Sequence, residues 1–263
     1  MQEIDFINGR GYEVISFPDG EKHLRLIELD RKEEVAIKMR IKSSDDLFLL
    51  MQLSDILKRQ CVNVRSITIP YLMGMRCDRL FSLDESFSLK IVADVINSFN
   101  ASEVRIFEPH SQRSLTLINR TTPICPSYNI HKDKAILCFP DKGARDRYGY
   151  CDSDKSPIIC SKVRDIGTGE LRGFFIETIG DYVEGDEIIV LDDLCDGGGT
   201  FLGIAEKLRL LKPSKLTLSV THAVNPLGIE RVSKTYDEVI ITNTFADWGN
   251  LSIPSNVRVI NVI

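Results

Sequence analysis

The segment from Glu187 to Thr200 carries the most specific chemistry in the sequence. It reads Glu-Ile-Ile-Val-Leu-Asp-Asp-Leu-Cys-Asp-Gly-Gly-Gly-Thr, so an apolar run ends in two carboxylates and then passes through three glycines. Glycines let backbone N–H groups approach a ligand without obstruction by a Cβ atom. The helix predicted over residues 201–211 would direct its unpaired N–H donors to the same point. This pattern is typical of a loop that binds a phosphate monoester.

The two carboxylates indicate what else the ligand carries. Asp192 and Asp193 would repel a phosphate, but their oxygens accept hydrogen bonds from sugar hydroxyls. We therefore predict a sugar phosphate, with its ring hydroxyls at these aspartates. The phosphate would lie in the loop of Asp196, Gly197, Gly198, Gly199 and Thr200. The alternative is a plain strand-to-helix turn with a glycine-rich cap. The segment has neither the Gly-Lys-Ser/Thr of a Walker loop nor a Gly-x-Gly-x-x-Gly dinucleotide turn.

Alternating strand and helix patterns surround this segment and would position it. Helical spacing predicts helices that begin near Ser43 and Ser86, and a third over residues 201–211. Strands are predicted at residues 11–17, 23–29, 34–39, 66–70, 103–107, 135–139, 157–161, 173–177, 187–191, 216–221, 238–242 and 257–260. This alternation is typical of α/β domains with parallel sheets flanked by helices.

The chain is long enough for two such domains. Its 263 residues exceed the usual size of one domain. Residues 121–126 contain two prolines and no periodicity, so we place a boundary there, between an N-terminal domain of residues 1–121 and a C-terminal domain of residues 122–263. A ligand cleft between two α/β domains is the expected architecture.

Composition and charge exclude several classes of protein. The longest apolar runs, such as Leu47–Met51, are far shorter than the roughly 20 residues of a membrane span, and the acidic start Met1–Asp5 lacks a secretory signal. A net charge of −5, from 33 basic and 38 acidic residues, disfavours nucleic acid as a partner. Seven cysteines without Cys-x-x-Cys spacing favour free thiols in a reducing compartment. We expect a cytoplasmic protein without membrane or nucleic-acid partners.

The segment 187–200 resembles the phosphoribosyl-pyrophosphate (PRPP) motif of type I phosphoribosyltransferases and of ribose-phosphate pyrophosphokinases, the PRPP synthetases. Asp196 favours the synthetases, because the transferases usually carry Thr or Ser there. Further stretches similar to synthetase motifs occur in the same order along nearly the whole chain. They are Phe17–Glu21 (Phe-Pro-Asp-Gly-Glu), Ile69–Arg79, Glu108–His110, Phe139–Gly143 and Ser161–Arg164.

The resemblance implies both a fold and a reaction. The fold would be two α/β domains with parallel sheets like those of type I phosphoribosyltransferases. The reaction would transfer the diphosphoryl group of ATP to O1 of ribose 5-phosphate, with Mg²⁺ as cofactor. Lys162 and Arg164 would be the catalytic groups on a mobile loop, followed by a closing lid at Asp165–Gly169. An Arg suits this role because its fork binds two phosphate oxygens at once.

The resemblance also implies an ATP side and a metal site. His110 and Asp141 match the magnesium positions, although His is an unusual magnesium partner. The ATP-binding residues would be Phe17, Asp19, Glu21, Arg76, Asp78 and His110. The first three of these would come from a neighbouring subunit, so the resemblance implies a homo-oligomer, at least a dimer, with a hexamer as the larger option.

Several departures from the family pattern accompany the resemblance. Cys77 replaces a Gln, Gly197 replaces a Thr, and one of two glycines after Asp141 is lost. The turn at Phe17 lies close to the N-terminus, so we expect an opening strand–helix unit to be shortened or missing. Two alternatives stay open: a phosphoribosyltransferase that uses PRPP and a base, and a catalytically inactive regulatory relative of the synthetases.

Overall fold

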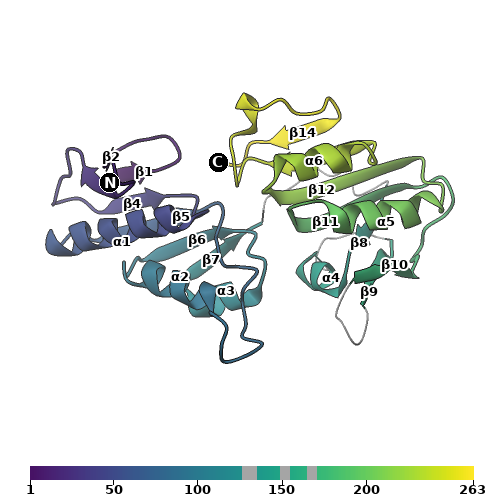
Figure 1. Cartoon of the computed structure of the whole chain (residues 1–263), viewed down its shortest axis with the longest axis horizontal. Helices are drawn as coiled ribbons and strands as arrows, with labels where there is room; N and C mark the ends of the chain where they lie inside the picture. The colour runs from purple at the N-terminus through teal and green to yellow at the C-terminus, as the bar shows by residue number, and fades with distance from the viewer. Residues whose placement is uncertain (126–134, 149–154, 165–170) are drawn as a thin grey trace. The chain divides into compact units, whose positions relative to one another are not determined.

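The computed structural model describes residues 1–125, 135–148, 155–164 and 171–263. The chain forms two compact units, Met1–Pro126 and Ser127–Ile263, and each is described by itself (Figure 1). The division falls beyond residue 121 because β7 (Thr121–Ile124) belongs to the first unit, where it pairs in parallel with β6. Pro123 fits there because β7 is an edge strand, where a missing N–H donor is tolerated.

Unit 1 is built on a five-stranded sheet in the order β1-β4-β5-β6-β7, in which every pair is parallel. Its other strands are β1 (Gln2–Asp5), β4 (Val35–Lys38), β5 (Val64–Ile69) and β6 (Glu103–Phe107). The helices are α1 (Ser44–Arg59), α2 (Ser88–Asn97) and α3 (Gln112–Leu117), and all three lie on one face of the sheet (Figure 1). A capping box between Ser43 and Asp46 fixes the start of α1.

A separate hairpin lies between β1 and β4. Its strands, β2 (Tyr12–Ser16) and β3 (Lys22–Leu26), are antiparallel and match two predicted strands. Gln52 of α1 holds β3, because its Oε1 accepts from Leu24 N at 2.7 Å and its Nε2 donates to Lys22 O at 2.8 Å. A turn follows β1, and in it Oδ1 of Asp5 accepts from Ile7 N at 2.8 Å.

Unit 2 contains a seven-stranded sheet in the order β10-β9-β8-β11-β12-β13-β14. All its pairs are parallel except β10 with β9. The strands are β8 (Ala135–Phe139), β9 (Ile158–Arg164), β10 (Leu171–Thr178), β11 (Glu187–Cys195), β12 (Lys215–Ala223), β13 (Glu238–Thr242) and β14 (Val257–Ile260). The helices are α4 (Lys142–Tyr148), α5 (Gly199–Arg209), α6 (Pro226–Ser233) and the 3₁₀ turn η1 (Trp248–Asn250).

Helices cover both faces of the unit 2 sheet. Alternate residues of β8 show this: Leu137 and Phe139 pack against Ala144 and Tyr148 of α4, while Cys138 belongs to the core formed with α5 and α6. The predicted fold class, α/β with parallel sheets flanked by helices, is confirmed. In the described part of the chain, no helix has the length and apolar character that a membrane crossing requires.

Candidate active site

The strand order of unit 2 reverses between β8 and β11. From β8 the chain continues to β9 on one side of the sheet, whereas from β11 it continues to β12 on the other. Loops that leave adjacent parallel strands in opposite directions open a crevice at the carboxyl ends of those strands, where ligands of α/β proteins bind. Asp141 follows β8, and the Asp196–Gly198 loop follows β11. The topology thus brings two of the predicted motifs to one place.

Asp192 and Asp193 lie inside β11, which extends to Cys195 instead of ending at residue 191 as predicted. Both side chains are almost fully buried, with Asp193 only 1% exposed. Arg147 of α4 bridges them: its Nη2 lies 2.7 Å from Oδ1 of Asp192 and 2.7 Å from Oδ1 of Asp193. No motif in the sequence indicated Arg147, although two adjacent buried carboxylates require a nearby cation.

The electrostatics of these three groups are linked. Burial, followed by the negative charge of Asp193, raises the pKa of Asp192 well above its ordinary value, and Arg147 acts in the opposite direction. Burial alone would lower the pKa of Arg147, but the carboxylates of Asp193 and Asp192 raise it. The guanidinium therefore stays charged, and it limits the cost of burying two acidic groups side by side.

The glycine loop that follows leaves its outer surface open. Gly198 has a left-handed backbone (φ +78°) and is the N-cap of α5, without a side-chain hydrogen bond to the helix. A Cβ atom at Gly197 or Gly199 would meet nothing within 4 Å. The space beside these two glycines is therefore open. Binding of a phosphate by the N–H groups of the first turn of α5, which includes Thr200, stays a prediction.

Lys162 lies within β9, opposite Phe174 of β10, and not on a loop as predicted. Its Nζ is 3.1 Å from Oδ2 of Asp141, so the structure brings these two predicted residues together. Arg164 is the last residue of β9. Its side chain and the predicted lid at residues 165–169 lie outside the described residues.

Asp141 is held on both of its oxygens. Oδ1 accepts from Ala144 N at 3.0 Å and thereby supports the start of α4, while Oδ2 accepts from Lys162. Burial alone would raise the pKa of Asp141, but the Ala144 amide and the Lys162 ammonium lower it below its ordinary value. Asp141 is therefore an ionised carboxylate beside the Lys162 ammonium. The described residues contain no group of three or more His, Cys, Asp or Glu side chains that could enclose a metal ion.

In unit 1, the predicted ATP-side residues follow neighbouring strands. Arg76 and Asp78 come after β5, and His110 comes after β6. Arg113 of α3 connects the two loops, because its Nη1 donates to the backbone oxygen of Asp78 at 3.3 Å. Burial would raise the pKa of Asp78, but hydrogen bonds from Arg79 and Ser111 lower it. Asp78 is buried and Arg76 is exposed. No motif in the sequence indicated Arg113.

The third predicted ATP element is the tip of the β2–β3 hairpin. The turn closes with Gly20 N donating to Phe17 O at 2.9 Å and Glu21 N donating to Oδ1 of Asp19 at 3.1 Å. Gly20 takes a left-handed backbone (φ +94°) that favours glycine. Phe17, Asp19 and Glu21 are all exposed, so the turn presents them to solvent.

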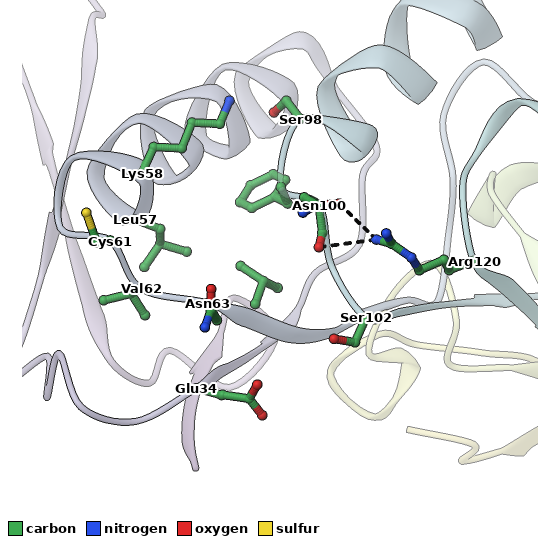
Figure 2. Close-up of a pocket in the computed structure, with 12 residues that line it drawn as sticks. Glu34, Leu57, Lys58, Cys61, Val62, Asn63, Ser98, Asn100, Ser102 and Arg120 are labelled. Atoms are coloured by element: carbon green, nitrogen blue, oxygen red, sulfur yellow. Dashed lines mark hydrogen bonds between the residues drawn. The ribbon is translucent and has the colours of Figure 1, made fainter.

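A pocket of about 640 Å³ lies at the opposite end of the unit 1 sheet, at the amino ends of its strands (Figure 2). None of the predicted site residues lines it. Arg120 on its rim bonds the backbone oxygen of Ala101 at 2.7 Å and the side chain of Asn100 at 3.0 Å. Other lining residues are Glu34, Leu57, Lys58, Cys61, Val62, Asn63, Val64, Ser98, Phe99 and Ser102.

Comparisons with known proteins agree with the motif order. No family model matches the chain. The ribose-phosphate pyrophosphokinase of Pyrococcus furiosus is 28% identical, over 95% of this chain and 89% of that protein. That of Hyphomonas neptunium is also 28% identical, over 95% and 84%. Ribose-phosphate pyrophosphokinase 2 of Archaeoglobus fulgidus is 29% identical, over 87% and 82%.

A solved structure confirms the fold. The phosphoribosylpyrophosphate synthetase from Mycobacterium smegmatis superimposes with a TM-score of 0.77 at 19% sequence identity, and the match covers 95% of this chain and 86% of that one. The sequence relatives and the ordered motifs agree with this likeness. The chain is therefore related to the ribose-phosphate pyrophosphokinases along nearly its whole length.

Proposed function

We propose that this chain is a ribose-phosphate diphosphokinase, which transfers the β,γ-diphosphoryl group of ATP to O1 of ribose 5-phosphate and releases AMP. The observation that carries the proposal is the glycine loop at the crevice of unit 2, with Asp192 and Asp193 on the preceding strand. Relatives over nearly the whole chain bear the name of this activity.

The crevice of unit 2 would bind ribose 5-phosphate. The N–H groups of the loop from Asp196 to Thr200 would hold the 5-phosphate, since the surface above Gly197 and Gly199 is open. Asp192 would accept hydrogen bonds from the ribose hydroxyls, with Asp193 next to it. Arg147 would keep both carboxylates in position through its two contacts of 2.7 Å.

In the transfer step, O1 of the sugar forms a bond to the β-phosphorus of ATP while the bond from that phosphorus to the oxygen of AMP breaks, and the O1 proton is lost to solvent. Such a step depends on in-line positioning and on neutralisation of charge. Lys162 and Arg164 would supply positive charge to the transferring group. Lys162 would have to leave Asp141, with which it is paired at 3.1 Å.

We include Mg²⁺ in the proposal. Asp141 fits such an ion, because its carboxylate is ionised and one of its oxygens already lies against a cation, the Lys162 ammonium. Mg²⁺ is usually bound by one or two carboxylates together with substrate phosphates. Asp141 would be its partner in unit 2. The resemblance also implies a magnesium role for His110 of unit 1. When bound, the ion would neutralise charge on the phosphates of ATP.

Unit 1 would bind ATP. Arg76, which is exposed, and Asp78 lie on the loop after β5, and His110 lies on the loop after β6. The hairpin tip presents Phe17, Asp19 and Glu21 to solvent. We propose that the hairpin serves a neighbouring subunit in a homo-oligomer. The described cysteines are all free, which fits a cytoplasmic location.

An assay of both products tests the proposal. Incubation of the chain with ribose 5-phosphate, ATP and Mg²⁺ should give AMP and PRPP in equal amounts. Consumption of PRPP with a nucleobase, releasing pyrophosphate, would instead identify a phosphoribosyltransferase. Binding of ribose 5-phosphate without any AMP, under varied phosphate and metal concentrations, would identify an inactive relative.

A further inference from the structure

Helix α6 packs directly against the glycine loop. Val224, just before the helix, donates its backbone N–H to Cys195 O at 2.9 Å. A Cβ atom at Gly228 would overlap the carbonyl oxygen of Asp196 and lie 3.2 Å from the carbonyl carbon of Gly197. The loop backbone thus rests on α6 at the point where Gly228 has no side chain.

A second contact continues this packing along the same face of α6. A Cβ atom at Gly198 would lie 2.8 Å from Cγ1 of Val232 and 3.1 Å from the carbonyl oxygen of Gly228. Gly228 and Val232 are four residues apart and therefore share one face of the helix. Successive parts of the loop contact successive turns of α6, so the helix limits how far the loop can move inward.

The backbone of Gly228 gives no reason for a glycine. It lies within α6 and its φ is not left-handed. Glycine inside a helix is destabilising relative to alanine. Close approach of the Asp196 carbonyl is the remaining physical reason for glycine at this position.

We infer that Gly228 is a positioning residue for the sugar-phosphate loop. The absence of its side chain lets the loop from Asp196 to Gly198 lie close to α6, which sets the direction of the N–H groups at the start of α5. The identity of the ligand, ribose 5-phosphate, rests on the proposed function, whereas the position of the loop does not.

The experiment compares Gly228→Ala with Gly203→Ala. Gly203 is the matched control because it also lies inside a helix, α5, and its Cβ would also overlap a neighbour, the ring of Phe174. That neighbour is not the loop. Two quantities are measured on the full chain: hydrogen exchange of the amides at residues 196–200, and the affinity and kinetics with ribose 5-phosphate.

In Gly228→Ala, the amides of residues 196–200 should exchange at least about tenfold faster. The Kd and KM for ribose 5-phosphate should rise by about ten- to hundredfold, as expected for a misplaced binding group. The KM for ATP and the kcat at saturating ribose 5-phosphate should stay within about threefold of the wild type. Gly203→Ala should lower the melting temperature but change neither the loop exchange nor the sugar-phosphate affinity.

Val232→Ala provides a second variant in case Gly228→Ala does not fold. It removes the methyl groups against which Gly198 rests, so loop exchange should increase, by less than in Gly228→Ala. Unchanged loop exchange in either folded variant, or equal effects of Gly228→Ala and Gly203→Ala, would overturn the inference. A wild-type chain that binds no ribose 5-phosphate would refute the proposed function instead, and loop exchange would still decide the role of Gly228.

Discussion

The two units use parallel sheets with different strand orders. In unit 1 the order β1-β4-β5-β6-β7 advances in one direction, whereas the order in unit 2 reverses between β8 and β11. When all crossovers have the same hand and the strand order advances in one direction, every helix lies on the same face of the sheet. This is the arrangement of α1, α2 and α3 in unit 1 (Figure 1). Among the described residues, unit 2 alone has helices on both faces of its sheet and a reversal of strand order.

The difference explains the burial of the two sets of site residues. In β4, Val35 and Ile37 are buried while Ala36 and Lys38 are half-buried, an alternation that follows from a sheet covered by helices on one face. Every residue of β8 is buried. Arg147, the cation paired with Asp192 and Asp193 in unit 2, is itself enclosed, with its side chain 18% exposed. In unit 1 the partner of the buried Asp78 is Arg79, at 2.9 Å, and its side chain is 57% exposed.

The largest expected effect is in the buried charge group of unit 2. Arg147→Met would leave Asp192 and Asp193 buried without their cation, and loss of one partner from a buried ion pair costs about 3–5 kcal/mol. Chemical denaturation should show this loss. Arg79→Met, which removes the partner of Asp78 in unit 1, is the control and should cost less than about 1 kcal/mol, because Arg79 is exposed. Equal costs would contradict the proposed contrast between the units.

The next effect concerns turnover. Lys162→Ala should lower the rate of PRPP formation by at least about a hundredfold, in line with the loss of a preorganised charge donor, and leave the affinity for ribose 5-phosphate nearly intact. Lys155→Ala is the control, since Lys155 also pairs with an aspartate, Asp186 at 3.5 Å, away from the crevice. An unchanged rate in Lys162→Ala would remove Lys162 from the mechanism.

A smaller effect is expected in unit 1. Arg113→Ala removes the bond that connects the loops after β5 and β6, so the KM for ATP should rise by about fivefold to tenfold while the KM for ribose 5-phosphate stays constant. Steady-state kinetics with each substrate varied would measure this. Arg105→Ala, which removes an exposed pair with Glu103, should change neither constant. A matching rise for ribose 5-phosphate would mean that the effect is not confined to the ATP side.

The smallest effect is the pH dependence of stability, which should have opposite signs in the two units. Asp78 has a lowered pKa in the folded state, so its contribution is present at neutral pH and is lost as the pH falls below about 4. The pKa of Asp192 is raised, so its contribution decreases as the pH rises from about 4. Unfolding of Asp78→Asn and Asp192→Asn against pH, each compared with the wild type, should give opposite slopes of order 1 kcal/mol in total. Slopes of the same sign would contradict this.

The sequence predicted the strands best where the apolar pattern was complete. Residues 103–107 and 135–139 form strands with the predicted bounds, because their β-branched and aromatic residues are buried by the sheet. The turn between β11 and α5 was also predicted from its glycines, since Gly198 takes a backbone conformation that few other residues adopt.

The sequence did not predict α4, and with it Arg147. A helix of seven residues, Lys142–Tyr148, has too few turns to show apolar periodicity, and it is stabilised by the packing of Ala144 and Tyr148 on β8. Lys162 was predicted as a site residue but placed on a loop. The pairing with β10, which extends β9 beyond Lys162, is not visible in the sequence of β9 itself. The two strands are consecutive in the chain, but the stability of a strand depends on its cross-strand neighbours and not on its own residues alone.

The strand order of the two sheets also has a consequence for how each unit folds. In unit 1, each strand of the main sheet after β1 pairs with the sheet strand that precedes it in the chain, so the sheet can grow in the order of synthesis. In unit 2, β8 pairs with β11, and the strands β9 and β10 lie between them in the chain. The sheet can extend toward β14 only after this pairing has formed. Pairings between distant segments form slowly, because loop closure costs entropy before contacts compensate for it. We therefore expect the crevice to be among the last parts of the molecule to form.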